Sequence, residues 1–548
     1  MMGVCSKAQG KVIQRLSWLL GRGTSGFSML LLCGFSLGCE AKEVIAPSLP
    51  DAAFEEKRDV LPPALPTHRL IQAPPQVGLS GARLWVALED HLGQGTTKTH
   101  SGKVLKLTSA GQPMRLVDGN GKEYQGTDLV ISWRLAPLAA PVSLARDIAG
   151  PYASFESAER VAIAWRRLGV TAVVAHPGDW QVWAPFGSKT PEGLATTSWQ
   201  TTVESSVQPV LQAADGGHTL KGPVLIDSPD GLRWKGGVYR GPFRLQPDAY
   251  GSWTLVEQVP LERYLEGVVP HEIGSGAPGA ALAAQAVLAR TWALANKHRF
   301  EIDGYHLCSD TQCQVYSDPR QASQNVRQAI QATSGNVLTW QGVPINAVYH
   351  ASNGGVMADG TEAWSMAPVS YLKARIDGSP SWNESFALPL NTSSAVAMLL
   401  DEESGLHGTE HPRFRWTRRL ADAELVQAIR PLSANVSPPL RVTVVERGRS
   451  GRVLSLEIAG SGAEDQPVTL TLDGIRRRLR QLPSTLFVLN ELNPGVWEFN
   501  GGGFGHGAGL SQAGAIDLAQ QGWTTDRILS HYYPGTTLER LSFPERSP

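Results

Sequence analysis

From Ala82 onward, apolar and polar residues alternate in short runs that Gly, Asp and Asn residues separate. The first runs are ARLWVALE and GKVLKLTS, and VLIDS, LRWKGG and GPFRLQP follow further along the chain. Alternation with a period of two, bounded by turn residues, is typical of β-strands. We therefore expect residues 79–250 to form a β-rich N-terminal region.

One segment inside this region has a helical pattern. Residues 150–194 read GPYASFESAERVAIAWRRLGVTAVVAHPGDWQVWAPFGSKTPEGL, with apolar side chains at Ala158, Val161, Ala162 and Trp165. This spacing places the four side chains on one face of a helix. The pattern predicts a βαβ insert in which a strand, a helix and two further strands follow one another.

The alanine-rich run GAALAAQAVLARTWALAN predicts a helix from about residue 279 to 296, preceded by Pro278. Alanine on most faces lets such a helix pack closely and fully buried. Gln285 and Arg290 would then need hydrogen-bond partners inside the core. A second helix is expected in SQAGAIDLAQQG, and the fold class is predicted as α+β, with a mixed α/β region over 251–545.

The first 45 residues are typical of an export signal, because an apolar run from Phe27 to Leu37 follows four basic residues and precedes Gly38-Cys39. The Gly-Cys step resembles a bacterial lipoprotein processing site, but Ser36 stands where a leucine is usual. Lipid attachment at Cys39 therefore stays open. Residues 46–78 are proline-rich and predict a linker, so we expect an exported protein of the periplasm or cell envelope.

The net charge bears on possible binding partners, and the cysteines bear on a possible disulfide or metal site. The formal net charge is −1, which gives no basic excess for binding nucleic acid. The basic run GIRRRLR, residues 474–480, is expected to be an exposed face. Outside the signal only Cys308 and Cys313 remain, and an exported protein favours a disulfide between them. A zinc site that adds His306 and a further ligand, or free thiols, are the alternatives.

Two short stretches are candidates for chemistry. Glu272 follows Pro270-His271 on a turn near apolar residues, and burial there would raise the pKa of its carboxyl group. An ordinary capping or salt-bridged glutamate is the alternative. The stretch GGGFGHGAGLSQAGA surrounds His506 with glycines, which indicates a close approach to the backbone. We expect His506 to be displayed for a ligand, or else to be a buried structural histidine.

Two family resemblances extend these interpretations. Residues 150–194 resemble a SPOR repeat, a small peptidoglycan-binding module. The matching residues are Tyr152, Ser154-Phe155, Ala158, Trp180, Val182 and Phe186-Gly187-Ser188, and an ordinary aromatic-rich βαβ unit is the alternative. The chain from about Ala82 to Leu541 resembles the stage II sporulation protein D (SpoIID/LytB) family of peptidoglycan lytic transglycosylases and amidase enhancers. This resemblance is carried by VPLERYLEGVVPHE with ALAAQAVLARTWAL, SDTQCQVY, ATSGNVLTWQGVPINAVYHASNGGVMADGTEAW with YLKARID, SGRVLSLEIAG with PSTLFVL, and GGGFGHGAGLSQAGAIDLAQQGWTTDRILSHYYPGTTL.

The SpoIID resemblance implies roles for particular positions. It makes Glu272 the catalytic acid and base of a lytic transglycosylase, which cleaves the bond between N-acetylmuramic acid (MurNAc) and N-acetylglucosamine (GlcNAc) and leaves a 1,6-anhydro end. It also implies a set of residues that could line a glycan cleft: Gln285, Arg290, Gln314, Tyr316, Tyr349, Ser352, Gly354, Gly355, His506, Ser511 and Gln512. Gly503, Gly505, Gly507 and Gly509 would let His506 and backbone amides approach a sugar ring or the catalytic carboxyl group.

The same resemblance leaves alternatives open. The partners would be peptidoglycan strands, stripped of peptides or not, and in the second interpretation a cell-wall amidase that a non-catalytic protein activates. A hydrolase with another substrate is the third. Some members of the family bind zinc through a histidine that precedes the second cysteine, where this chain has Gln312. The loop HEIGSGAPG also lacks the methionine and tryptophan of many relatives.

Overall fold

The computed structural model describes residues 69–72, 83–462 and 466–541, and these belong to one compact unit, Leu65–Pro548. The predicted signal (1–45), Cys39 and all of the predicted linker (46–78) except 69–72 lie outside the described residues. Helices and strands both occur throughout the unit, which confirms the α+β class. None of the helices that the structure describes is long and apolar enough to cross a membrane.

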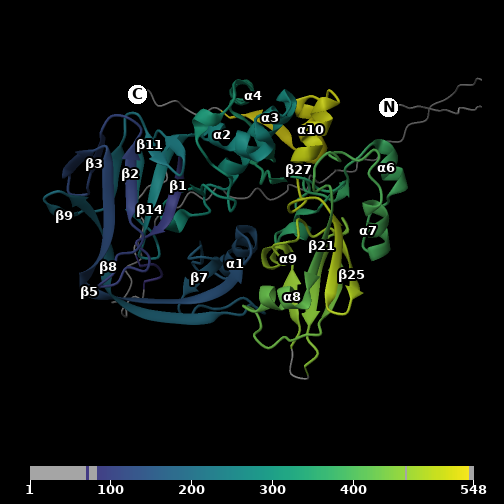
Figure 1. Cartoon of the computed structure of the whole chain (residues 1–548), viewed down its shortest axis with the longest axis horizontal. Coiled ribbons are helices and arrows are strands. Elements are labelled where there is room, and N and C mark those ends of the chain that lie inside the picture. The colour runs from purple at the N-terminus through teal and green to yellow at the C-terminus, as the bar shows by residue number, and fades with distance from the viewer. Residues whose placement is uncertain (1–68, 73–82, 463–465, 542–548) are drawn as a thin grey trace, which may run out of the picture. The chain divides into compact units, whose positions relative to one another are not determined.

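The N-terminal region is built from two sheets (Figure 1). The first has the order β15-β1-β14-β13-β10-β3-β4, with bounds Leu307–Cys308, Arg83–Leu92, Trp253–Pro260, Phe243–Pro247, Val224–Asp227, Met114–Val117 and Glu123–Gly126. The second has the order β12-β11-β2-β5-β7-β6, and β8 joins it on β5 and carries β9. Their bounds are Gly237–Tyr239, Leu232–Trp234, Leu105–Ser109, Asp128–Tyr152, Trp180–Pro185, Val173–Ala175, Thr197–Ala213 and Gly216–Thr219.

The first sheet does not stop at residue 250, where the sequence suggested a boundary. β14 pairs with β1 along Arg83–Leu92 and leads directly into α2 (Leu261–Val269). The short strand β15 adds to the other edge of β1, in parallel. The β-rich region and the helical region are therefore joined by a continuous sheet, and they share one hydrophobic core.

The insert follows the predicted order of strand, helix and two strands. Helix α1 (Phe155–Arg167) lies between β5 and β6, and the Ser154 side chain caps its first turn. Ala158, Ala162 and Trp165 are buried, as their spacing predicts, while Val161 is only partly buried. They pack in one cluster with Trp85 of β1 and with residues of the helical region, such as Phe300.

The alanine-rich helix α3 (Gly279–Ala295) confirms the predicted span to within one residue. It packs against α2, α4 (Gln324–Ala332), α10 (Gln512–Gln520) and α11 (Thr525–Tyr532). Every residue of α3 from Ala281 to Ala293 is buried, because alanine allows close approach on all faces. A small sheet of β16 (Asn336–Trp340), β17 (Val343–Pro344) and β28 (Thr537–Arg540) lies beside these helices.

The segment from 358 to 509 has its own hydrophobic clusters. Two three-stranded sheets form it, with orders β21-β26-β25 and β22-β23-β24, over Arg415–Ala421, Val496–Gly502, Phe487–Asn493, Arg441–Arg447, Val453–Ala459 and Val468–Thr471. Its helices are α5, α6, α7, α8 and α9, over Gly360–Ala363, Pro380–Ser385, Ser393–Leu400, Asp422–Ile429 and Asp473–Arg478.

Short pairings connect this segment to the helical region. β18 (Tyr349–His350) pairs in parallel with β27 (Leu510–Ser511), and β19 (Val356–Met357) pairs with β20 (Arg375–Ile376). Isolated bridges join Ser352 to Phe504 and Ala358 to Ala508. The glycine-rich stretch around His506 is thereby held against residues 349–358.

Candidate functional site

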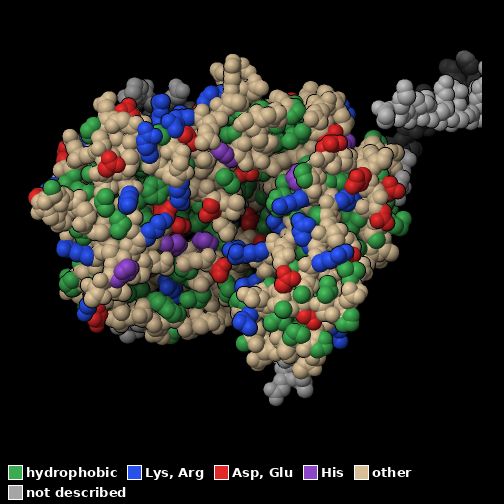
Figure 2. Space-filling view, in the orientation of Figure 1, with side chains coloured by type: hydrophobic (Ala, Val, Ile, Leu, Met, Phe, Trp, Pro, Cys, Tyr) green, Lys and Arg blue, Asp and Glu red, His purple; other side chains and the backbone are tan. Residues whose placement is uncertain are grey.

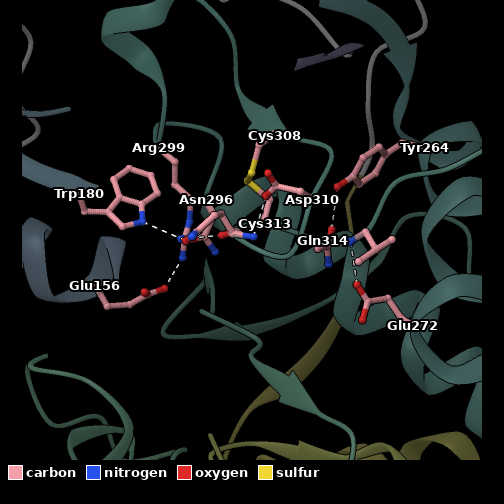
Figure 3. Close-up of a disulfide and its surroundings, with 12 residues drawn as sticks. Glu156, Trp180, Tyr264, Glu272, Asn296, Arg299, Cys308, Asp310, Cys313 and Gln314 are labelled. Atoms are coloured by element: carbon pink, nitrogen blue, oxygen red, sulfur yellow. Dashed lines mark hydrogen bonds and ion pairs between the residues drawn. A yellow bond between two sulfur atoms is a disulfide. The ribbon is translucent and has the colours of Figure 1, made fainter. Parts of the chain in front are cut away.

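Glu272 lies on a π-helical turn, Pro270–Gly274, between α2 and α3. Pro270 ends α2, so the chain leaves the regular helix just before the glutamate. The Glu272 carboxylate accepts a hydrogen bond of 2.9 Å from the backbone N–H of Val315 (Figure 3). A segment 43 residues further along the chain therefore fixes the side chain.

A chain of side chains runs through the core to Glu272. The Tyr264 hydroxyl donates to Gln314 Oε1 at 3.1 Å, and Gln314 Nε2 donates to the Tyr349 hydroxyl at 2.9 Å. Tyr349 then hydrogen-bonds to the Glu272 carboxylate. Because the Tyr349 oxygen accepts from Gln314, its own proton is directed at Glu272.

A second link reaches Glu272 from α3 and α10. Gln512, the first residue of α10, donates through Nε2 to Gln285 Oε1 at 3.3 Å and also hydrogen-bonds to Glu272. Gln285 is fully buried on α3. The buried glutamine that the alanine-rich sequence singled out thus acts through Gln512.

Burial raises the pKa of Glu272 above its ordinary value. Hydrogen bonds from Val315 N–H, Gln512 and Tyr349 favour the ionised form and offset part of this rise. In the described structure no cationic side chain forms an ion pair with Glu272. A carboxyl group with this balance is suited to donating a proton and taking one back.

The cysteines are joined. Cys308 and Cys313 form a disulfide, with their Cα atoms 5.7 Å apart (Figure 3). Nδ1 of His306 accepts a hydrogen bond of 2.9 Å from the Trp85 N–H. Within the described ranges no group of three His, Cys, Asp or Glu residues could hold a metal ion. These residues therefore do not fit the zinc alternative.

The disulfide loop contacts the insert on one side, and the residues that follow it contact Glu272 and Tyr349 on the other. Gln312 accepts a hydrogen bond of 3.1 Å from the indole N–H of Trp180 in β7. The segment after Cys313 supplies Gln314 and the Val315 N–H. The loop thus ties the insert to the residues that hold Glu272, as Figure 3 shows.

His506 is neutral at physiological pH. Burial lowers the pKa of its imidazole to about 3, and Arg476 contributes in the same direction. Its Nδ1 accepts from the Ala508 N–H at 3.2 Å, so Nε2 carries the proton and donates to the Tyr349 carbonyl at 2.8 Å. The ring also lies 4.5 Å from that of Trp364. His506 thus positions the backbone of Tyr349 and contributes to the wall of a cleft.

The glycines around His506 are explained by close contacts with other parts of the chain. All four have positive φ, and a Cβ on Gly507 would run into the Arg452 guanidinium, while one on Gly509 would meet the Val348 carbonyl. The protein's own chain approaches these positions. A Cβ on Gly503 would likewise meet the Ser352 carbonyl, and one on Gly505 would meet the His350 side chain, so tight packing of the loop explains why these positions are glycines.

Several residues that the sequence suggested for the cleft lie elsewhere. Arg290 is fully buried and pairs with both Glu262 oxygens, at 2.8 and 2.6 Å, so it joins α3 to α2. Tyr316 donates to Glu257 at 2.9 Å within the core. Ser511 caps α10 by accepting from the Gly514 N–H at 3.2 Å. Ser352, Gly354 and Gly355 are buried where the glycine-rich stretch packs.

A cleft of about 560 Å³, called the main cleft below, opens at Glu272. Figure 2 shows a hollow at the centre of this face, with basic side chains along its border. Three parts of the chain line the main cleft: the start of α1, the helical region with its disulfide loop, and α9 with Trp364 and His506. The residues used below are Phe155, Glu156, Glu272, Trp292, Arg299, Gln314, Tyr349, Trp364, Asp473, Arg476, Arg477, Arg480 and His506.

The wall from α9 was missed by the sequence interpretation. The run GIRRRLR was expected to be an exposed face, but Arg476 and Arg480 line the main cleft. Arg477 reaches across to the insert, where it hydrogen-bonds to the Ala153 carbonyl and pairs with Asp179 at 3.3 Å. A run of three arginines with Asp473 before it was the signal available in the sequence.

The insert supplies the opposite wall. Glu156 pairs with Arg299, whose guanidinium lies over the rings of Phe155 at 4.5 Å and Trp292 at 4.7 Å. Aromatic rings and charged groups on the walls of a cleft are suited to sugars, which present both apolar and hydroxyl faces. The insert is therefore part of the site.

A second cavity of about 340 Å³, the side cavity, shares Glu272 with the main cleft. It is lined also by Gln512, Ala351, Glu410 and His411. Glu272 thus lies where two spaces meet. A polymer bound through both would present an internal bond to this carboxyl group.

Two family models match the chain. The model of the stage II sporulation protein family matches residues 249–340, which include Glu272, Gln285, Arg290 and Gln314. A domain of unknown function (DUF8618) matches residues 358–509, which include α9 and His506. The main cleft is therefore lined by both matched regions and by the insert.

Curated relatives have modest identity. Stage II sporulation protein D of Bacillus subtilis is 27% identical over 377 residues, 65% of this chain and 89% of its own length. The amidase enhancer of Bacillus subtilis is 28% identical over 298 residues, and the match covers 50% of this chain but only 40% of that protein. An uncharacterized protein of Brachyspira hyodysenteriae is 25% identical over 321 residues, 58% and 76% of the two chains.

These matches cover less of the chain than residues 82–541, over which the sequence blocks resemble the family. They agree with those blocks on the region that holds Glu272. With the named relatives, they support a relationship to the stage II sporulation protein D family, at modest identity.

Proposed function

We propose that the protein is a peptidoglycan lytic transglycosylase of the cell envelope in which Glu272 is both acid and base. The observation that carries the proposal is the position of Glu272, a carboxyl group with a raised pKa at the meeting of two cavities. A glycan strand lying through both cavities would place a glycosidic oxygen beside it. The family relationship supports the substrate class.

In the proposed reaction, protonated Glu272 gives its proton to the oxygen between MurNAc and GlcNAc as the bond from that oxygen to C1 of MurNAc breaks. The carboxylate then takes the proton of the MurNAc C6 hydroxyl, whose oxygen bonds to C1. A 1,6-anhydro ring forms, GlcNAc leaves with a free hydroxyl, and no water is consumed. Glu272 ends protonated, ready for another cycle.

The residues around Glu272 suit these two steps. Val315 N–H, Gln512 and Tyr349 stabilise the carboxylate that forms after the first proton transfer. Burial keeps the acid protonated beforehand. One carboxyl group is enough, because the attacking hydroxyl belongs to the substrate.

The test is mass spectrometry of the soluble products after purified protein is incubated with peptidoglycan, both intact and stripped of peptides. We expect anhydro-MurNAc ends with the wild type and none with Glu272→Gln. Glu266→Gln is the matched control, since it removes a carboxyl group on α2 outside the main cleft. Products that persist in Glu272→Gln but vanish in Asp473→Asn would assign the acid to Asp473 and overturn the role of Glu272.

A second candidate function rests on the relative named as an amidase enhancer. In that case the cleft would hold glycan without cleaving it, and a cell-wall amidase would be the partner. Wild-type protein that releases no anhydro ends yet still pellets with sacculi, and increases peptide release by an added amidase, would favour this function.

A further inference from the structure

Four arginines surround a cavity beside the main cleft, called the arginine pocket below. It has a volume of about 380 Å³. Arg418 comes from β21 and Arg413 from the residues just before it, while Arg476 and Arg480 come from α9 and the turn that follows. Phe504 of the glycine-rich stretch supplies apolar wall.

The pocket is cationic, although the carboxylate of Asp473, which lines the neighbouring main cleft, interacts electrostatically with Arg476. No carboxylate lines it, and across residues 83–462 and 466–541 none of its four arginines forms an ion pair. The Nε atom of Arg476 is buried without a hydrogen-bond partner. An unpaired buried donor on a guanidinium group is costly unless a ligand completes it.

Contacts with the protein also orient two of the guanidinium groups in the arginine pocket. The Arg413 guanidinium lies 4.1 Å from the centre of the Phe504 ring, and Arg418 donates to the Thr417 carbonyl at 2.8 Å. Both contacts orient the planar groups before any ligand arrives. Oriented guanidinium groups recognise carboxylates through pairs of hydrogen bonds.

The arginine pocket continues the main cleft, because Arg476 and Arg480 line both. A strand bound at Glu272 would thus carry its side groups toward the arginines. On a strand of MurNAc and GlcNAc, the anionic groups are carboxylates: the free lactyl group of MurNAc, or those of an attached peptide.

We infer that the arginine pocket binds a carboxylate carried by a MurNAc residue of the strand in the main cleft. This inference rests on the proposed function, because it takes the glycan strand as the ligand of that cleft. The pocket gives the protein a means of distinguishing peptidoglycan from an uncharged GlcNAc polymer.

The experiment measures dissociation constants by isothermal titration calorimetry, in the Glu272→Gln background so that no ligand is cleaved. The ligands are a peptide-stripped GlcNAc-MurNAc oligomer, a peptide-bearing one, and a neutral GlcNAc oligomer of equal length. The test variant is Arg413→Gln with Arg418→Gln, and neither residue lines the main cleft. Arg430→Gln, an exposed arginine at the end of α8, is the control for the loss of charge.

We expect the test variant to lose about tenfold in its preference for an anionic oligomer over the neutral one, since a charge-assisted hydrogen bond has this order of effect. The control should keep that preference. A loss with the stripped oligomer identifies the lactyl carboxylate, and a loss confined to the peptide-bearing oligomer identifies a peptide carboxylate.

Two other outcomes overturn the inference and are distinguishable. If the test variant keeps the full preference, the arginine pocket binds no part of the strand, and the proposed function stands. If the parent protein binds none of the three oligomers, the proposed function itself fails, and this inference fails with it.

Discussion

The Glu272 carboxylate is held at 2.9 Å by the backbone N–H of Val315, two residues beyond the disulfide between Cys308 and Cys313. The proposed acid therefore depends on a loop that is closed covalently and docked on the insert through Gln312 and Trp180. The position of the Glu272 carboxylate therefore depends on the disulfide between Cys308 and Cys313, which takes no part in the proposed reaction.

Opening that loop should weaken both stability and cleavage. For the variant with Cys308→Ser and Cys313→Ser we expect the free energy of unfolding to fall by about 2 kcal/mol, because a short loop gains freedom in the unfolded chain. Release of anhydro ends should fall as well, since Val315 N–H is no longer fixed. Urea unfolding and product analysis check the two effects. Reductant should lower the activity of the wild type but not that of the variant, and equal sensitivity in both would contradict the link.

The raised pKa of Glu272 predicts the pH dependence of cleavage. The proposed mechanism starts from the protonated acid, so kcat/KM should fall as pH rises through the pKa of this carboxyl group, which burial raises above its ordinary value. His506, with a pKa of about 3, should cause no change of rate with pH near neutrality. A pH–rate profile on soluble glycan oligomers checks this. A rate that rises steadily with pH would argue against Glu272 as the acid.

Tyr349→Phe should move that profile. The variant removes a hydrogen bond that favours the ionised form of Glu272, so the pKa rises further and the alkaline limb moves to higher pH. The maximal rate should fall, since the carboxylate formed after proton transfer loses a donor. Tyr371→Phe, a change in another buried tyrosine outside the main cleft, is the control and should leave the limb in place.

Much of the local structure could be predicted from the sequence, and the reason is that local patterns determine it. The periodicity of residues 155–167 and the alanines of 279–295 predicted two helices, and Ser511 was expected at the start of a third, α10. Proline and apolar neighbours indicated that Glu272 would be buried. Each of these inferences needed only residues close together in the chain.

The composition of the cleft walls could not be predicted in the same way, because it depends on contacts between distant segments. Arg290 was expected to contact a ligand, but its partner Glu262 lies on α2, and only the packing of α2 on α3 shows the pairing. Likewise, the position of Arg476 follows from how residues 358–509 fold. A run of arginines has the same appearance in the sequence whether it faces solvent or a cleft.

The assignment of Arg290 to the core leads to a last prediction. Arg290→Met leaves Glu262, a partly exposed carboxylate, without its partner and removes hydrogen bonds to the Asn336 and Ile330 carbonyls. We expect the free energy of unfolding to fall by about 3 kcal/mol, the lower end of the range for a broken buried pair, because solvent still reaches Glu262. Cleavage per folded molecule should stay within about twofold, since no atom of Arg290 lines the main cleft.

Arg290→Lys keeps the charge but not the paired geometry, and its stability should lie between those of the wild type and the methionine variant. Urea unfolding measures the stability, and product analysis at a temperature where both proteins are folded measures the activity. A methionine variant that is as stable as the wild type but inactive would show that Arg290 acts in the functional site. The expected opposite result, a loss of stability with activity retained, would separate the residues that build α2 and α3 from those that act on the glycan.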